Sequence, residues 1–101
     1  MTTNELINNI TQTFAEGVLL VERKNADYAG SEDCFRNFRF SAIVGVSPER
    51  AILVRVADKL ARVSNLLDKE SQVKDEHITD TLLDMINYLA ILKAMLSEQQ
   101  S

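Results

Sequence analysis

Hydrophobic positions recur at helical spacing along most of the chain. Between residues 4 and 26, one face of the predicted helix carries Leu6, Ile7, Ile10, Phe14, Val18 and Val21. The polar stretch "DYAGSEDC" at residues 27–34 interrupts this pattern, and it contains Gly30, which tolerates the backbone conformations of tight turns. The pattern therefore predicts a first helix over roughly residues 4–26, followed by a loop.

Two more helices are predicted in the middle of the chain. The segment "FRNFRFSAIVG" at residues 35–45 predicts a short helix that ends at Gly45, although its Phe-rich alternation departs from helical spacing. In the motif "SPER", Ser47 can cap a helix, Pro48 suits the first helical position and Glu49 complements the helix dipole. This helix is expected to reach about residue 67, with a core face made of Leu53, Val56, Leu60, Val63 and Leu67.

The last helix follows the polar loop "DKESQVK" at residues 68–74. Asp75 or a near neighbour is expected to cap it, and it should run to about Glu98. Its main apolar face consists of Ile78, Leu82, Met85, Ile86, Leu89, Leu92 and Leu96. Because no segment has a convincing strand pattern, the sequence predicts an all-α protein, a small bundle of about four helices in a single domain spanning residues 1–101.

This last helix also carries apolar residues on a second side. Leu83, Ile91 and Met95 share the side on which Asp80 and Asp84 lie. One apolar face is enough to form a core, so a second one suggests burial against another subunit. We therefore expect a homo-oligomer, either a dimer or a tetramer.

Composition narrows the possible classes of protein. The 101 residues are 46% hydrophobic and 26% charged, which is typical of one globular domain. No apolar run is long enough for a membrane span, the N-terminus lacks a signal pattern, and Cys34 is the only cysteine, so a cytoplasmic location is expected. The net charge of −4 argues against a general DNA-binding protein.

The charge is distributed unevenly along the sequence. Residues 35–62 contain six basic and two acidic side chains, while the whole protein has a net charge of −4. A locally basic segment in an acidic protein suits a small anionic ligand. Chance and internal salt bridges are the alternative explanation for the same distribution.

Two charged stripes could form a site between the third and last helices. Glu76, Asp80 and Asp84 recur four residues apart and therefore lie on one helix face. The third helix has a stripe of its own, formed by Arg55, Asp58, Arg62 and Asn65 with Lys59 beside it. Carboxylate oxygens are ligands that Mg²⁺ prefers, and nearby cations can hold phosphates. The same charges can instead pair as interhelical salt bridges without any ligand.

Several of these segments resemble a known family. "KNADY" at residues 24–28, "FRNF" at 35–38, "ADKLARVSNLL" at 57–67 and "DEHITDTLLDMINYLAIL" at 75–92 resemble the phage-associated family called nucleotide modification associated domain, type one. That family is similar in layout to the all-α nucleotide pyrophosphatases of the MazG and dimeric dUTPase kind. The resemblance implies a helical bundle that holds Mg²⁺ between acidic clusters and cleaves nucleoside triphosphates to monophosphate and pyrophosphate.

The resemblance to the pyrophosphatases is partial. Asp80 and Asp84 match the second acidic motif of the MazG kind, and Glu76 joins them at an unusual spacing. The first acidic motif, Glu-Glu-x-x-Glu, is absent, and its helix offers Asp58 among cations instead. Two-metal phosphoryl chemistry requires several carboxylates. The absence of the first acidic motif therefore favours a protein that binds a nucleotide without turnover. Such a protein would resemble the phage anti-CBASS sponges, which sequester linear or cyclic nucleotide signals.

Two functions follow as hypotheses. The first is a nucleotide-binding sponge without a cofactor, and the alternative is a Mg²⁺-dependent nucleoside triphosphate pyrophosphohydrolase with Glu76, Asp80 and Asp84 as metal ligands. For both, aromatic side chains would stack on bases and cations would clamp phosphates. The predicted ligand-binding residues are Lys24, Asn25, Asp27, Tyr28, Phe35, Arg36, Asn37, Phe38, Arg55, Asp58, Lys59, Arg62, Asp80, Asp84 and Tyr88.

Overall fold

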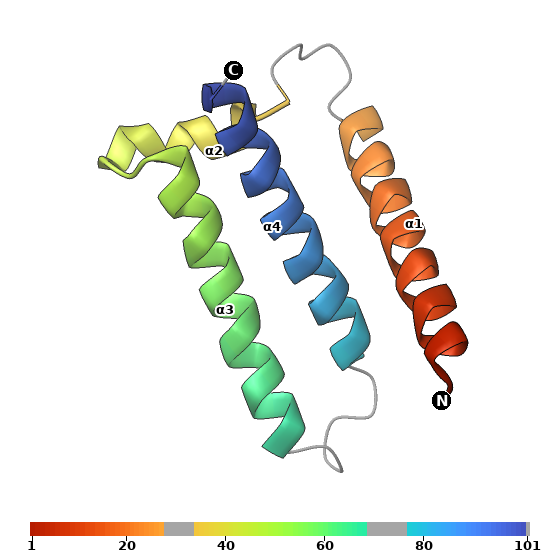
Figure 1. The fold of residues 1–101 in the computed structure, drawn as a ribbon. Coiled ribbons are helices and arrows are strands. Elements are labelled where there is room, and N and C mark those ends of the chain that lie inside the picture. The colour runs from red at the N-terminus through yellow and green to blue at the C-terminus, as the bar shows by residue number, and fades with distance from the viewer. Residues whose placement is uncertain (28–33, 69–76, 101) are drawn as a thin grey trace. The chain divides into compact units, whose positions relative to one another are not determined.

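The structure, a computed structural model, describes residues 1–27, 34–68 and 77–100, and these residues form helices and turns without a strand. Figure 1 shows the helices in order along the sequence. They are α1 (Thr3–Asp27), α2 (Arg36–Arg39), the 3-10 helix η1 (Phe40–Val44), α3 (Pro48–Asp68) and α4 (Ile78–Gln100). The expectation of an all-α fold is confirmed. The protein consists of two compact units, Met1–Ser31 and Glu32–Ser101.

The first unit consists of α1, which begins with a reciprocal cap. The backbone N–H of Glu5 donates to the Thr2 hydroxyl at 3.2 Å, and the backbone N–H of Thr2 donates to the Glu5 carboxylate at the same distance. This capping box satisfies two backbone donors that the first turn would leave without partners. The apolar stripe expected on this helix is exposed over most of its length, including Ile10 and Phe14.

The second unit begins with a short helical segment that reverses the chain. The expected helix over residues 35–45 is divided between α2 and η1, and it ends at Gly45 in the left-handed conformation with a φ of 77°. This conformation lets the backbone N–H of Gly45 donate to the Ala42 carbonyl oxygen and that of Val46 donate to the Ser41 carbonyl oxygen. The turn leads directly into the start of α3.

The helices α3 and α4 form an antiparallel hairpin, visible side by side in Figure 1. The Ser47 hydroxyl accepts a hydrogen bond of 3.2 Å from the backbone N–H of Arg50, which confirms Ser47 as the cap of α3. At this end of the hairpin the Gln99 amide donates to the Glu49 carboxylate, so the start of α3 lies beside the end of α4.

The core of the second unit lies where α2 meets this hairpin. Its buried members are Phe35, Phe38, Ile52 and Met95, with Val56, Tyr88, Ile91 and Leu92 packed around them. Ile52 is fully buried, with an exposed fraction of 0%. Residues before and within α2 thus supply aromatic side chains that fill the angle between the first turns of α3 and the last turns of α4.

The buried side of α3 differs from the predicted one. Val63 is buried and Val56 packs on the core as expected, but Leu53, Leu60 and Leu67 are exposed. Ile52, which the predicted face did not include, is the most buried of the residues that the structure describes. One residue step turns the side chain by about 100°, so packing against Ile52 moves Leu53 toward the solvent.

The buried side of α4 is also rotated. Leu82, Leu89 and Leu96 were expected in the core and are exposed, whereas Met95, expected at a subunit interface, is 5% exposed and buried within its own chain. Ile91 packs on the same core, so the predicted interface through Ile91 and Met95 is wrong. Phe35 and Phe38 cover that side of α4, and the sequence pattern of α4 alone does not show that they pack there.

No helix in the described part is long and apolar enough to cross a bilayer.

The complete burial of Ile52 predicts that its substitution by a smaller residue destabilises the protein strongly. Ile52→Ala should lower the free energy of unfolding by about 2–5 kcal/mol, because the cavity it leaves is lined by residues that cannot collapse into it freely. Ile43→Ala provides a matched control, since Ile43 is 81% exposed, and it should change the free energy by less than about 0.5 kcal/mol. Urea denaturation followed by circular dichroism measures both, and equal effects would contradict this core.

The lowered pKa of the Glu49 carboxylate predicts that the stability of the fold depends on pH. Hydrogen bonds from its own backbone N–H, then from Gln99 and Ser47, lower the pKa of Glu49 below its ordinary value of 4.5. A lowered pKa adds stability that is fully present above pH 4.5 and is lost as the pH falls through the folded-state value. The difference in unfolding midpoint between the wild type and Glu49→Gln should therefore shrink below pH 4.5.

The partner of Glu49 supplies the control for this measurement. In a Gln99→Ala background the same Glu49→Gln comparison should give a smaller pH-dependent difference, because one of the hydrogen bonds that lowers the pKa is gone. A difference that stays constant from pH 3 to 7 would show that the Glu49 carboxylate adds nothing to folding.

Candidate functional site

An arginine lies over two aromatic rings where α2, α3 and α4 meet. The Arg55 guanidinium carbon is 4.7 Å from the centroid of the Phe38 ring and 5.8 Å from that of the Tyr88 ring. The two rings meet edge to face, with centroids 6.4 Å apart and an interplanar angle of 83°. Both distances are within the range of cation–π attraction. We call Phe38, Arg55 and Tyr88 the arginine–aromatic cluster.

The core positions each member of the cluster. Phe38 is buried in α2, and Tyr88 packs against the same core from α4. Arg55 follows the buried Ile52 by three residues on α3, so its side chain emerges at the edge of the core and extends over the rings. The residue as a whole is exposed, so part of its guanidinium surface faces solvent.

An ion pair lies one helical turn from the cluster. The Lys59 ammonium is 3.3 Å from a carboxylate oxygen of Asp84, and the two side chains are 30% and 31% exposed. Lys59 follows Arg55 by four residues and Asp84 precedes Tyr88 by four, so the pair continues the cluster along both helices. Partly solvated pairs of this kind contribute little stability, typically about 0–1 kcal/mol.

Two further arginines lie against aromatic rings in the segment before α3. The guanidinium carbon of Arg36 is 5.8 Å from the centroid of the Phe40 ring, and that of Arg39 is 6.0 Å from the centroid of the Phe35 ring. Both arginine residues are exposed. Positive charge therefore surrounds the aromatic residues of α2 and η1 as well as those of the cluster.

The structure brings together part of the predicted site. Phe38, Arg55, Lys59, Asp84 and Tyr88 contact one another in pairs, as described above. The other described members that lie on the surface are Lys24, Arg36, Asn37, Asp58, Arg62 and Asp80. Phe35 is a core residue with an exposed fraction of 8%, so its ring is not available for stacking on a base.

Some predicted site residues are not part of this arrangement on the second unit. Lys24 belongs to the first unit. The side chains of Asn25 and Asp27, as well as Tyr28 and Glu76, lie outside the described residues. Within residues 1–27, 34–68 and 77–100 no group of three or more His, Cys, Asp or Glu side chains is placed to hold a metal ion. The metal set of Glu76, Asp80 and Asp84 therefore stays a prediction.

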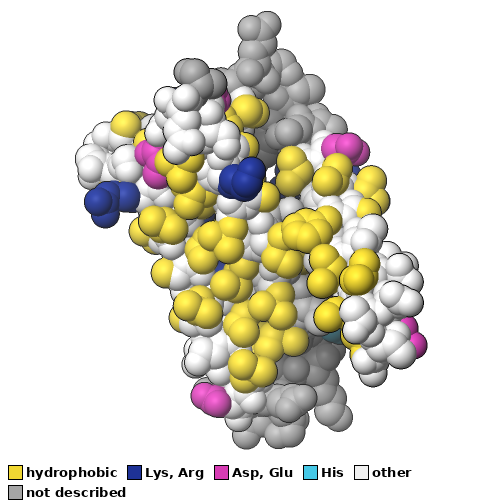
Figure 2. Space-filling model, in the orientation of Figure 1, with side chains coloured by type: hydrophobic (Ala, Val, Ile, Leu, Met, Phe, Trp, Pro, Cys, Tyr) yellow, Lys and Arg dark blue, Asp and Glu magenta, His cyan; other side chains and the backbone are white. Residues whose placement is uncertain are grey.

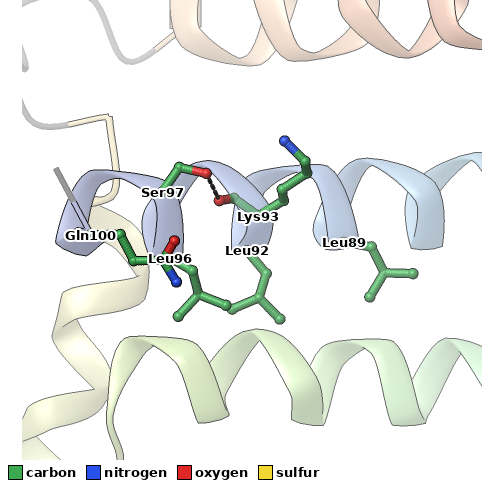
Figure 3. Close-up of a pocket in the computed structure, with 6 residues that line it drawn as sticks. All are labelled: Leu89, Leu92, Lys93, Leu96, Ser97 and Gln100. Carbon is green, nitrogen blue, oxygen red and sulfur yellow. Dashed lines mark hydrogen bonds between the residues drawn. The ribbon is translucent and has the colours of Figure 1, made fainter.

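A second surface feature was not among the predicted site residues. An open depression on α4 is lined by Leu89, Leu92, Lys93, Leu96, Ser97 and Gln100. Figure 3 shows Leu89, Leu92 and Leu96 pointing toward the α3 side, while the Lys93 side chain extends away from α3. Sequence reasoning missed this feature because it assigned these leucines to the core.

Comparison of the sequence and fold with family models, curated proteins and solved structures finds no match.

The cluster predicts a measurable coupling between Arg55 and Tyr88. In a double-mutant cycle with Arg55→Met and Tyr88→Leu, we expect a coupling free energy of about 0.5–2 kcal/mol, because either change removes the same cation–π contact. Replacing Arg55→Met by Arg50→Met gives the control cycle, since Arg50 lies about 140° around α3 from Arg55. Chemical denaturation of the four variants in each cycle measures the coupling, and equal values in both cycles would contradict the contact.

Proposed function

We propose that the protein binds a nucleotide at the arginine–aromatic cluster and holds it without turnover. The observation that carries this proposal is the position of Arg55, 4.7 Å above the buried Phe38 ring and one turn from Lys59. A guanidinium fixed on one side by aromatic rings is ordered before the ligand arrives. Less side-chain entropy is then lost on binding.

The phosphate would be bound by the cations of α3. Arg55, Lys59 and Arg62 recur within two turns, so at least two of them can approach one anion. Arginine can hold a phosphate bidentately, whereas lysine acts as a point charge. Lys59 would exchange its Asp84 carboxylate for the phosphate, which keeps the ammonium paired in both states.

The base would stack on the outer surface of the Arg55 guanidinium. Phe38 is buried and Arg55 covers it, so the planar surface available to a base is the guanidinium itself. Bases stack on arginine planes as well as on aromatic rings. The half-buried Tyr88 would bound this position on the α4 side.

The Lys59–Asp84 pair supports binding without hydrolysis. Asp84 belongs to the acidic set that would hold Mg²⁺ in a pyrophosphohydrolase, and its carboxylate is 3.3 Å from the Lys59 ammonium. A cation at that distance competes with Mg²⁺ for the same oxygen atoms. Sequestration of a linear or cyclic nucleotide signal, as in phage anti-defence sponges, is the role that such a site would serve.

Ligand recovery separates binding from turnover. We expect isothermal titration with nucleoside triphosphates and with cyclic dinucleotides to detect saturable binding of at least one compound, unchanged by EDTA. The bound compound should be recovered intact after denaturation, as identified by mass spectrometry. Release of monophosphate and pyrophosphate only when Mg²⁺ is present would show instead that the protein is a pyrophosphohydrolase.

A matched pair of variants tests the position of the site. Arg55→Met should weaken binding by about ten- to a hundredfold, because a hydrogen-bonded charge contributes about 1.5–3 kcal/mol. Arg50→Met removes the same charge from another side of α3 and should leave the affinity unchanged. If neither variant alters the affinity, or if no nucleotide binds, the proposed site is wrong.

A further inference from the structure

Six leucines form two exposed rows on the α3–α4 hairpin. They are Leu53, Leu60 and Leu67 of α3 and Leu82, Leu89 and Leu96 of α4, and their exposed fractions lie between 41% and 64%. We call this set the leucine face. Figure 2 shows hydrophobic side chains gathered over α3 and α4 on one face of the molecule. Contiguous exposed apolar surface of this kind marks an interaction site.

The two rows share one register. Within each helix the leucines recur every seven residues, and the contact between Glu49 and Gln99 brings the start of α3 beside the end of α4. Counting along both helices from that contact puts Leu53 near the level of Leu96, Leu60 near that of Leu89, and Leu67 near that of Leu82. The leucine face therefore consists of three layers, spaced by about 10.5 Å along each helix.

The leucine face continues the seam between α3 and α4. Val56 and Val63 occupy the other apolar position of each heptad on α3, and Met85 and Leu92 occupy it on α4. These four residues are buried or partly buried, whereas the leucines of the same heptads are exposed. In each heptad, one apolar position is covered within the hairpin. The other, the leucine position, remains exposed and can pack against another helix.

Small side chains and separated charges border the leucine row of α3. Ala57, Ala61 and Ser64 are exposed beside it, and small residues allow another helix to approach closely. Arg50 lies beside the row near Leu53, and Asp68 lies at the other end next to Leu67. Arg50 and Asp68 are ten and eight residues from Leu60, so they are nearly symmetric about the middle layer.

We propose that the leucine face docks against the leucine face of a second copy of this chain, with the two hairpins antiparallel. A two-fold axis through the Leu60 and Leu89 layer, running across both helices, places α3 on the partner's α3 and α4 on the partner's α4. Each outer leucine layer then meets a leucine layer, and Arg50 of each copy meets the partner's Asp68. The result is a four-helix core built from two hairpins.

The opposite pairing is disfavoured by charge. If the hairpins packed with equivalent ends together, the two-fold axis would run along the helices and place α3 on the partner's α4. Arg50 would then lie on the same edge as the partner's Lys93, which carries charge of the same sign. Equal leucine layers fit both arrangements, so the charges select the antiparallel one. This inference does not rest on nucleotide binding, because the arginine–aromatic cluster lies on the other flank of the hairpin.

Light scattering of the purified protein tests the assembly. At micromolar concentration we expect a mass of about 23 kDa, twice the 11.4 kDa of one copy. Leu60→Glu should give a monomer of unchanged helix content, since a charge in the middle layer cannot be buried unpaired. Ala94→Glu is the matched control, because Ala94 is exposed on α4 about 160° around the helix from Leu96 and so lies off the leucine face, and this variant should remain a dimer.

Charge exchange tests the orientation. Arg50→Glu and Asp68→Lys should each weaken the dimer at least tenfold in Kd, and the double variant should restore it, because each copy then regains an oppositely charged partner. A dimer that the double variant fails to restore would overturn the antiparallel arrangement. A wild-type monomer at this concentration, or a dimer indifferent to Leu60→Glu, would overturn the docking itself.

Cysteine cross-linking gives a test that does not depend on a destabilising charge. In a Cys34→Ser background, Leu60→Cys places two thiols near the proposed axis, and oxidation should join the two copies through a disulfide on a non-reducing gel. Ala94→Cys in the same background should stay uncrosslinked, because Ala94 lies off the leucine face. Equal cross-linking of both variants would contradict the proposed axis.

Nucleotide titration of Leu60→Glu separates the two proposals, since loss of the dimer should leave the affinity for the nucleotide unchanged.

Discussion

Burial of Ile52 under the aromatic residues of the α2 segment sets the orientation of both long helices. Ile52 is fully buried in one cluster with Phe35, Phe38 and Met95, and the side of α3 that faces the core is the one that carries it. Ile52 is one residue step, about 100°, from Leu53. The choice between these two positions decides which leucines are covered, which charges stand beside the aromatic rings, and which surface is left for a partner.

That choice gives the hairpin two chemically different flanks. On one flank Phe38 and Tyr88 support the Arg55 guanidinium, and the Lys59–Asp84 pair follows one turn later. On the other flank the leucine face remains half exposed. Transferring the exposed half of six leucine side chains from water contributes on the order of 5–9 kcal/mol per copy, which is comparable to the whole stability of a small domain. The proposed ligand site and the proposed dimer surface therefore lie on different flanks of one hairpin.

The helices themselves were predictable from sequence, whereas their rotation was not. Helical spacing and the Ser47 cap located α3, and Gly45 located the end of the preceding turn, because both signals are local. The heptad leucines form the more regular stripe, so the pattern placed Leu53 and Leu60 inside. Their exposure follows from Phe35 and Phe38, whose packing on Ile52 and Met95 joins residues more than ten and more than fifty positions apart. For the site, helical spacing put Arg55 and Lys59 on one stripe, but only the fold brings Phe38 to Arg55.

The turn at Gly45 requires a left-handed backbone conformation at one position. Its φ of 77° is the only positive φ in the described backbone, and a Cβ built there would meet nothing within 4 Å. The obstacle to any other natural residue is thus the left-handed backbone itself and has no steric contribution from neighbouring atoms. The mirror-image amino acid reverses that preference. If the protein were made by chemical synthesis, a D-alanine at this position would hold the turn in place more firmly than glycine does, because the unfolded polypeptide would have fewer conformations to lose.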